Sequence, residues 1–189
     1  MEVIFVLSGV VLGFVLSEVG LWWRDQRAAR AAKQSLAAVL LVEAMSQAHW
    51  CCQRGSKWNL LVQTGERIEL KVAQQDRPPE PQVYMAVAGQ IGQFEAKDAS
   101  SVIAFHGSVS AVRSLIDAWD DRVLRGGQSK DLAGKWRAAC ENALLAIRAL
   151  EPIAKIPSLP NDETEIAKLK HGLLIVAEGD IIEAGSNGP

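Results

Sequence analysis

The residue run from 3 to 23 constrains this chain more than any other feature. It consists of apolar and small residues with a single charge, at Glu18. As a helix rising about 1.5 Å per residue it is about 31 Å long, which matches the roughly 30 Å hydrocarbon core of a bilayer. We therefore predict that residues 1–23 form a transmembrane anchor.

The residues that follow this run are typical of a membrane boundary. Trp22 and Trp23 fall where an aromatic belt is expected, and no basic residue precedes the run. Four basic residues come directly after it: Arg24, Arg27, Arg30 and Lys33. The positive-inside rule then places the N-terminus outside the membrane and the chain after Trp23 in the cytoplasm. A cleaved signal peptide and a buried helix of a soluble domain are the two alternatives.

Glu18 and a series of small residues lie within the predicted anchor. The carboxylate of Glu18 can reach outward to water, contact another membrane helix, or form a proton or ion site. The small residues recur at helical spacing and predict a close helix–helix contact: Gly9, Gly13, Ser17 and Gly20. On a helical wheel Glu18 lies far from this small-residue face, so a dimer through the glycines would leave Glu18 facing lipid. Either its carboxylate then reaches outward to water, or the helix contacts partners on two sides.

The rest of the chain carries helical periodicity. We expect the anchor helix to continue to Arg54 and to end at Gly55, and a second helix to run from Ser56 to Gln75. A proline-rich linker at 76–81 precedes a shorter helix over 83–94. The expected inward positions of these elements are Leu41, Met45, Ala48 and Cys52, then Trp58, Leu61, Gly65, Ile68 and Val72, then Val83, Val87, Ile91 and Phe94.

Two long helices follow and carry the most regular patterns. The first has seven apolar positions at 3,4 spacing: Val102, Phe105, Val109, Val112, Ile116, Trp119 and Val123. The second, capped by Ser129 after Gly126-Gly127, has these residues inward: Leu132, Trp136, either Ala139 or Cys140, Ala143, Ile147 and Leu150. Because the turn between them is short, they must be antiparallel. A last short helix from Asn161 or Asp162 through His171 precedes a tail whose structure is left open.

Composition excludes several classes of protein. The chain has 189 residues, 22 acids and 20 bases, so it lacks the strongly basic character of a nucleic-acid-binding protein. Three cysteines do not make a disulfide framework. No phosphate loop, nucleophile elbow or metal motif is present in the sequence, and we predict no enzyme activity and no cofactor.

The segment His49-Trp50-Cys51-Cys52 is the only chemically suggestive cluster. A metal site needs three or four converging ligands, so we interpret Cys52 and Cys140 as small core residues and His49 as partly exposed. Trp58, Trp119 and Trp136 are expected in the core. Trp50, if exposed, is a candidate anchor for a protein contact.

The layout resembles a loose class of uncharacterised bacterial inner-membrane proteins with one N-terminal anchor and a cytoplasmic helical domain. The resemblance rests on SEVGLWWRDQRAAR, LLVEAM, the proline linker, VYMAVAGQIGQF and the long helix of Val102 to Val123. These are packing patterns, and the resemblance implies no activity and no functional residue.

We thus predict an all-α protein in which a transmembrane helix continues into an antiparallel cytoplasmic bundle of about four or five helices. The expected divisions are 1–23 for the anchor, 24–156 for the bundle, and 157–189 for a short helix and a flexible tail. The expected function is a membrane-tethered interaction, scaffold or regulatory module, with the lipid bilayer and a protein partner or second copy as its partners. The alternatives are an oligomerising or ion-conducting membrane effector and a ligand sensor with a pocket between helices.

Overall fold

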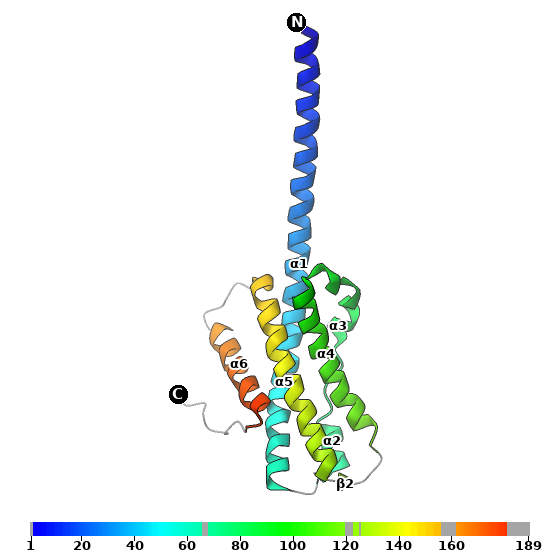
Figure 1. The fold of residues 1–189 in the computed structure, drawn as a ribbon, viewed down its shortest axis with the longest axis vertical. Coiled ribbons are helices and arrows are strands. Elements are labelled where there is room, and N and C mark those ends of the chain that lie inside the picture. Colours follow the sequence, from blue (N-terminus) through cyan, green and yellow to red (C-terminus); the bar gives the residue numbers. More distant parts are fainter. Residues whose placement is uncertain (1, 66–67, 120–122, 125, 156–161, 181–189) are drawn as a thin grey trace.

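The computed structural model is an all-helical bundle from which one long helix projects (Figure 1). It describes residues 2–65, 68–119, 123–124, 126–155 and 162–180, with side chains from residue 17 onward except at 68, 123, 124, 126, 162 and 163. The long helices are α1 (Glu2–Thr64), α4 (Ala96–Asp117), α5 (Gly126–Ala154) and α6 (Asp162–Glu178). The short elements are β1 (Ile68–Glu69), α2 (Leu70–Gln75), α3 (Gln82–Val87), the 3-10 helix η1 (Ala88–Gln93) and β2 (Val123–Leu124).

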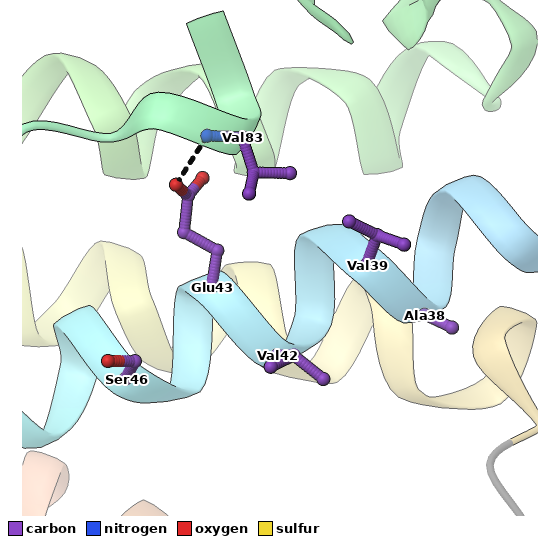
Figure 2. Close-up of a pocket in the computed structure, with 6 residues that line it drawn as sticks. All are labelled: Ala38, Val39, Val42, Glu43, Ser46 and Val83. Atoms are coloured by element: carbon purple, nitrogen blue, oxygen red, sulfur yellow. Dashed lines mark hydrogen bonds between the residues drawn. The ribbon is translucent and has the colours of Figure 1, made fainter. Parts of the chain in front are cut away.

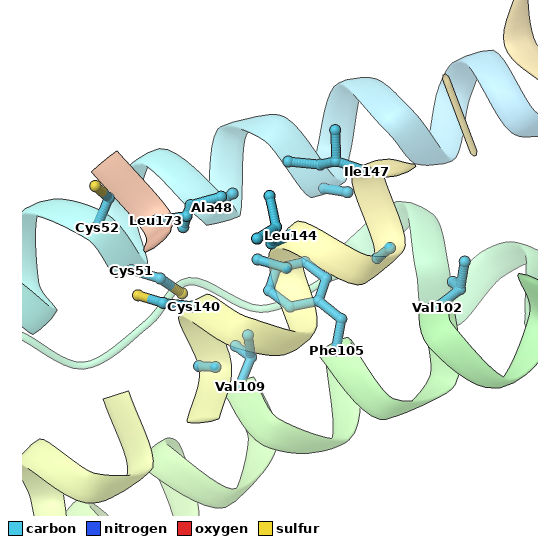
Figure 3. Packing of buried hydrophobic residues seen from close by; sticks show 14 of the residues in the cluster. Ala48, Cys51, Cys52, Val102, Phe105, Val109, Cys140, Leu144, Ile147 and Leu173 are labelled. Carbon is cyan, nitrogen blue, oxygen red and sulfur yellow. The ribbon is translucent and has the colours of Figure 1, made fainter. Parts of the chain in front are cut away.

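Helix α5 is the centre of the bundle. It packs against α1, α4 and α6, and α1 also contacts α6 and α3. The predicted inward positions of α5 are all buried, and so are five of those on α4, from Val102 to Ile116. The periodicity of these two helices therefore predicted their packing correctly, and Figure 3 shows several of these side chains meeting between α1, α4 and α5.

The prediction that α1 ends at Gly55 is wrong. The helix runs on to Thr64, and the turn is made by Gly65, whose φ is +68°. Gly55 is buried against α5 and α6, and a Cβ built there would lie 2.5 Å from Val176 Cγ1 and 3.5 Å from Cys140 Sγ. Gly55 therefore allows α1 to approach α5 and α6 closely, and it does not end a helix.

The predicted second helix over residues 56–75 is also wrong. Its first half belongs to α1, and after the turn the chain forms β1 and α2. Strand β1 pairs antiparallel with β2, Ile68 opposite Leu124. Helix α4 accordingly ends at Asp117 and not near Gly126, and Trp119 is only partly buried beyond it. The predicted helix over 83–94 is split into α3 and η1. Ile91 of η1 is buried, and so is Phe94, which directly follows η1.

The last helix is longer than expected. Helix α6 passes His171 and reaches Glu178, with Leu173 and Val176 fully buried against the bundle. The sequence pattern left the tail from residue 173 open, and the structure places its first part in the core. Residues 181–189 lie outside the described residues.

The described helices do not support the predicted membrane anchor. Within the described part of the chain, none is both long enough and apolar enough to cross a membrane. The side chains of residues 1–16, which make up most of the predicted span, lie outside the described set.

Candidate functional site

The N-terminal half of α1 stands clear of the bundle (Figure 1). Every residue from Ser17 to Ala32 is exposed, and the first buried positions are Leu36 and Ala37. Trp22 and Trp23 are 58% and 53% exposed, and their rings meet edge to face with centroids 5.9 Å apart. Large apolar side chains are thus presented on a stretch of α1 that no other described element covers.

The predicted basic residues lie directly below the tryptophans. Arg24, Arg27 and Arg30 are exposed, and Lys33 is half-buried where α1 enters the bundle. Arg24 Nε lies 3.9 Å from Asp25 Oδ1, and both side chains are mostly exposed. We call residues 24–33 the basic collar. It is available to an anionic partner, because only Asp25 offsets its charge.

The remaining predicted anchor residues are only partly described. Ser17, Glu18 and Gly20 are exposed, and a Cβ at Gly20 would meet nothing within 4 Å. Gly9 and Gly13 lie on the α1 backbone, but their surroundings fall outside the described side chains.

An open, apolar groove of about 460 Å³ lies beside α1, within the bundle. Figure 2 shows its lining, which is Ala38, Val39, Val42, Glu43, Ser46 and Val83. Val39 is 46% exposed and Val42 is 61% exposed. The ligand-sensor hypothesis calls for an enclosed cavity reaching polar groups, whereas this groove is open and its surface is almost entirely apolar.

The carboxylate of Glu43, the charged residue of this groove, is already hydrogen-bonded. Its two carboxylate oxygens accept hydrogen bonds from the backbone N–H groups of Val83 and Tyr84, each at 2.8 Å. The carboxylate thus satisfies free N–H groups at the start of α3 and fixes α3 to α1. It is a structural contact, and the apolar wall formed by Val39 and Val42 is what the groove leaves open.

The three cysteines are buried residues of the hydrophobic core. Cys51, Cys52 and Cys140 are free and buried, and Figure 3 shows Cys51 and Cys140 directed at one another from α1 and α5. Burial raises the pKa of Cys51 to about 12 and that of Cys52 to about 11, and it also raises the pKa of Cys140. Thiols of this kind are poor nucleophiles and poor metal ligands.

The other members of the predicted cluster are dispersed. His49 is exposed, and Trp50 is half-buried with the Arg54 guanidinium 4.6 Å from its ring centre. Among the described residues no group of three or more histidine, cysteine or acidic side chains is placed to hold a metal ion.

A buried carboxylate closes the far end of the bundle. Asp76 is 1% exposed, and its Oδ2 accepts hydrogen bonds from Lys57 Nζ at 2.7 Å and Trp58 Nε1 at 3.0 Å. Arg54 Nη1 lies 3.0 Å from Oδ1. Asp76 thereby joins the last turns of α1 to the end of α2, and it gives the fully buried Trp58 a partner for its N–H group.

His106 is the least expected buried group. It is 1% exposed, its ring stacks on Tyr84 with centroids 4.0 Å apart, and neither ring nitrogen has a hydrogen-bond partner among the described residues. Burial lowers its pKa to about 4, because the charged imidazolium is poorly solvated there. The ring is therefore neutral at pH 7 and packs as a flat core side chain.

Sequence reasoning missed Asp76, His106 and Glu43. His106 directly follows the inward Phe105, and this neighbour was the available signal for its burial. Asp76 sits in a segment that its prolines mark as a linker, and Glu43 lies on a helix whose partner segment is distant in sequence. Neither carboxylate has a local pattern that indicates its partners.

Comparisons with known proteins add no family to these observations. The chain matches no protein-family model, no curated protein and no solved structure.

Proposed function

We propose that this protein is a non-enzymatic interaction, scaffold or regulatory module that the N-terminal part of α1 tethers to the cytoplasmic face of a bacterial membrane. The observation that carries the proposal is the exposed Trp22–Trp23 pair on a projecting helix, followed at once by the basic collar. The apolar run before it supplies the segment that enters the bilayer. The bundle below supplies surfaces for a protein partner.

The physical argument is one of complementary environments. Exposed tryptophans are amphipathic and are favoured at the depth of lipid headgroups. Each basic residue near an anionic surface contributes about 1 kcal/mol of attraction. Along α1 the order is therefore apolar run, aromatic pair, basic collar and bundle, which is the order of environments met on leaving a membrane toward the cytoplasm.

Vesicle flotation of the full chain tests the tether. The purified protein is mixed with phosphatidylcholine vesicles, with or without phosphatidylglycerol, and centrifuged through a density gradient. We expect the protein to float with both and to float more completely with the anionic lipid. Replacing both Trp22 and Trp23 by serine should reduce flotation, whereas Met85→Ser, at an exposed apolar site on α3, should not.

The result that would overturn the tether is a folded full chain that stays at the bottom of the gradient with both kinds of vesicle. Far-UV circular dichroism of the same sample establishes that it is folded. Orientation is tested separately in spheroplasts, where added protease should leave the bundle intact. Digestion of the bundle before lysis contradicts a cytoplasmic location.

Glu18 supports a second candidate function, an oligomerising effector that conducts ions across the bilayer. The favouring observation is that this carboxylate is exposed on the projecting helix, while Gly20, on another face of the same helix, leaves space for a second helix. An effector produces ion flux in reconstituted liposomes that Glu18→Gln abolishes. A scaffold produces no ion flux in the liposomes, either as the wild type or as Glu18→Gln.

A further inference from the structure

A strap of residues 77–87 lies along the bundle between α1 and α4. It consists of the proline-rich segment and α3, and it connects two buried anchors, Asp76 at the end of α2 and Ile91 in η1. Its three prolines favour an extended conformation and supply no N–H group. The strap therefore depends on side chains of the two helices to hold it in place.

Helix α1 holds one edge of the strap. Glu43 accepts hydrogen bonds from two backbone N–H groups of α3, at 2.8 Å each, and Figure 2 shows one of them. Arg54 lies 3.0 Å from the anchor Asp76 at the other end. Gln47 and Trp50 lie between these two residues on the same helix face, because spacings of four and three return to one side of a helix. They therefore face the stretch of strap that connects the two contacts.

Helix α4 holds the opposite edge. Its contacts with the strap follow one another along the helix: His106 stacks on Tyr84, Arg113 Nη2 lies 3.4 Å from Glu80 Oε1, and Asp117 accepts two hydrogen bonds from Arg77 at 2.8 Å each. The three α4 residues are spaced by seven and four and share one face. We call these facing sides of α1 and α4 the strap site.

Much of the strap is held weakly. Only two prolines are buried between its anchors, and α3 has no buried residue. The side chains of Arg77 and Asp117 are 40% and 51% exposed, so their ion pair contributes little free energy. Glu80 is 67% exposed in its pair with Arg113. The strap can leave while both anchors stay in the core, because unwinding α3 supplies the extra chain length.

The strap site contains buried polar atoms that the strap does not satisfy. They are Gln47 Oε1, Trp50 Nε1 and Arg54 Nε on α1, and Arg113 Nη1 on α4. None of the four has a hydrogen-bond partner among the described residues, and the Gln47 residue is only 4% exposed. Buried polar atoms are usually paired, because leaving one unpaired costs free energy. An occupant with more hydrogen-bond acceptors than the strap would therefore fit the site better.

We propose that the strap site binds an extended acidic segment of a protein partner, which takes the place of the strap. Three of the four unpaired atoms are N–H donors, two of them on guanidinium groups, and carboxylates are strong acceptors for such donors. The strap itself shows that the site admits an extended chain with a carboxylate, that of Glu80, beside Arg113.

This proposal rests on the interaction function proposed above, and it does not depend on the tether. It is tested with the full chain in detergent solution, so a failure of peptide binding leaves the flotation result unaffected.

Hydrogen exchange tests whether the strap opens. We expect the backbone amides of residues 82–87 to exchange about tenfold faster or more than those of residues 132–150 in α5, measured by mass spectrometry of the full chain. Equal protection of the two stretches overturns the proposal, because a strap that does not open cannot be displaced.

Peptide binding tests the chemistry of the occupant. The strap-weakened variant, Arg77→Ala with Glu80→Ala, loses both ion pairs of the strap with α4 and keeps the strap site intact. It is titrated against labelled peptides with the sequence of residues 75–84, followed by fluorescence anisotropy. The acidic peptide carries Pro78→Glu, and its neutral match carries Pro78→Gln and Glu80→Gln. We expect the acidic peptide to bind about tenfold more tightly or more. Equal affinities, or no saturable binding, overturn the proposal.

The wild type and a matched variant test competition by the strap. The acidic peptide should bind the wild type more weakly than the strap-weakened variant, because the apparent affinity falls with the fraction of open protein. Glu151→Ala with Lys170→Ala removes an ion pair between α5 and α6 and should bind like the wild type. Circular dichroism establishes that both variants fold. The same affinity for all three proteins shows that the peptide binds elsewhere and overturns the proposal.

Discussion

The two halves of α1 form one continuous helix in opposite surroundings. From residue 17 to 32 every side chain is exposed, whereas from Leu36 onward one face is buried against α5 and the other carries the apolar groove. The lower half is held by tertiary packing, and the described part of the upper half depends on the helix propensity of its own residues. The comparison teaches that α1 is part of the bundle from Leu36 onward and a free surface from residue 17 to 32.

The largest expected effect lies at the bundle end of α1. Asp76→Ala removes the acceptor shared by Lys57 and Trp58 and leaves the indole N–H without its partner inside the core. We expect a loss of about 3 kcal/mol in the free energy of unfolding, measured by urea denaturation. Asp117→Ala, which breaks the exposed pair with Arg77, is the control and should change stability little. Similar losses from both substitutions would contradict the buried role of Asp76.

Lowering the pH should weaken the bundle through His106. Its folded pKa of about 4 lies below the ordinary value of 6.5, so the unfolded chain binds a proton that the folded chain rejects between these two values. This contribution to stability is complete above pH 6.5 and is lost as pH falls toward 4, by about 2 kcal/mol between pH 7 and pH 5. His106→Leu should reduce this dependence in urea titrations at the two pH values. An unchanged pH dependence would show that other groups cause it.

Gly55→Ala tests the close approach of α1 to α6. The helix propensity of alanine favours the change, but the new methyl group meets the stiff, buried Val176 side chain at 2.5 Å. We expect a net loss of roughly 1 to 2 kcal/mol in thermal or urea unfolding. Gly107→Ala on α4, where a Cβ meets nothing within 4 Å, should instead stabilise the protein. The interpretation fails if Gly55→Ala stabilises as much as Gly107→Ala.

The smallest effect concerns the projecting half itself. Ala28→Gly and Ala44→Gly make the same change in the same helix, one on the exposed half and one at a buried position. Ala44→Gly should destabilise the bundle by about 1 kcal/mol, because glycine disfavours helix and leaves a small gap. Ala28→Gly should leave the urea midpoint of the bundle unchanged in monomeric protein. Equal shifts would mean that the two halves of α1 unfold together.

Periodicity in the sequence predicted the packing of α4 and α5 well. The run from Val102 to Ile116 and the run from Leu132 to Leu150 are buried as expected, because a regular apolar stripe must face a core wherever that core is. The Trp22–Trp23 pair and the basic collar were also identified from local order alone, and the structure leaves both tryptophans exposed; their position at a membrane boundary stays a prediction. Such features depend on neighbouring residues in the sequence and not on distant segments.

Glycines and isolated polar residues were harder to interpret. Gly55 has the local signature of a helix end, yet its role depends on Val176, more than a hundred residues away. Asp76 acquires its partners only when α2 returns to the end of α1, and Glu43 caps α3 from the neighbouring helix. Local propensity does not encode these contacts, since each joins groups that folding alone brings together.

The sequence by itself determined that this protein is helical, which faces of its later helices are buried, and where an apolar run gives way to tryptophans and bases. The tertiary structure decided where α1 ends, that His106 and Asp76 are inside, and which side of α1 remains open. The physical reason is that helical periodicity shows which face of a helix must be buried. Which helix covers that face depends on segments far apart in the chain. The exposed apolar wall of Val39 and Val42 was recognised only once the buried face of α1 had been assigned.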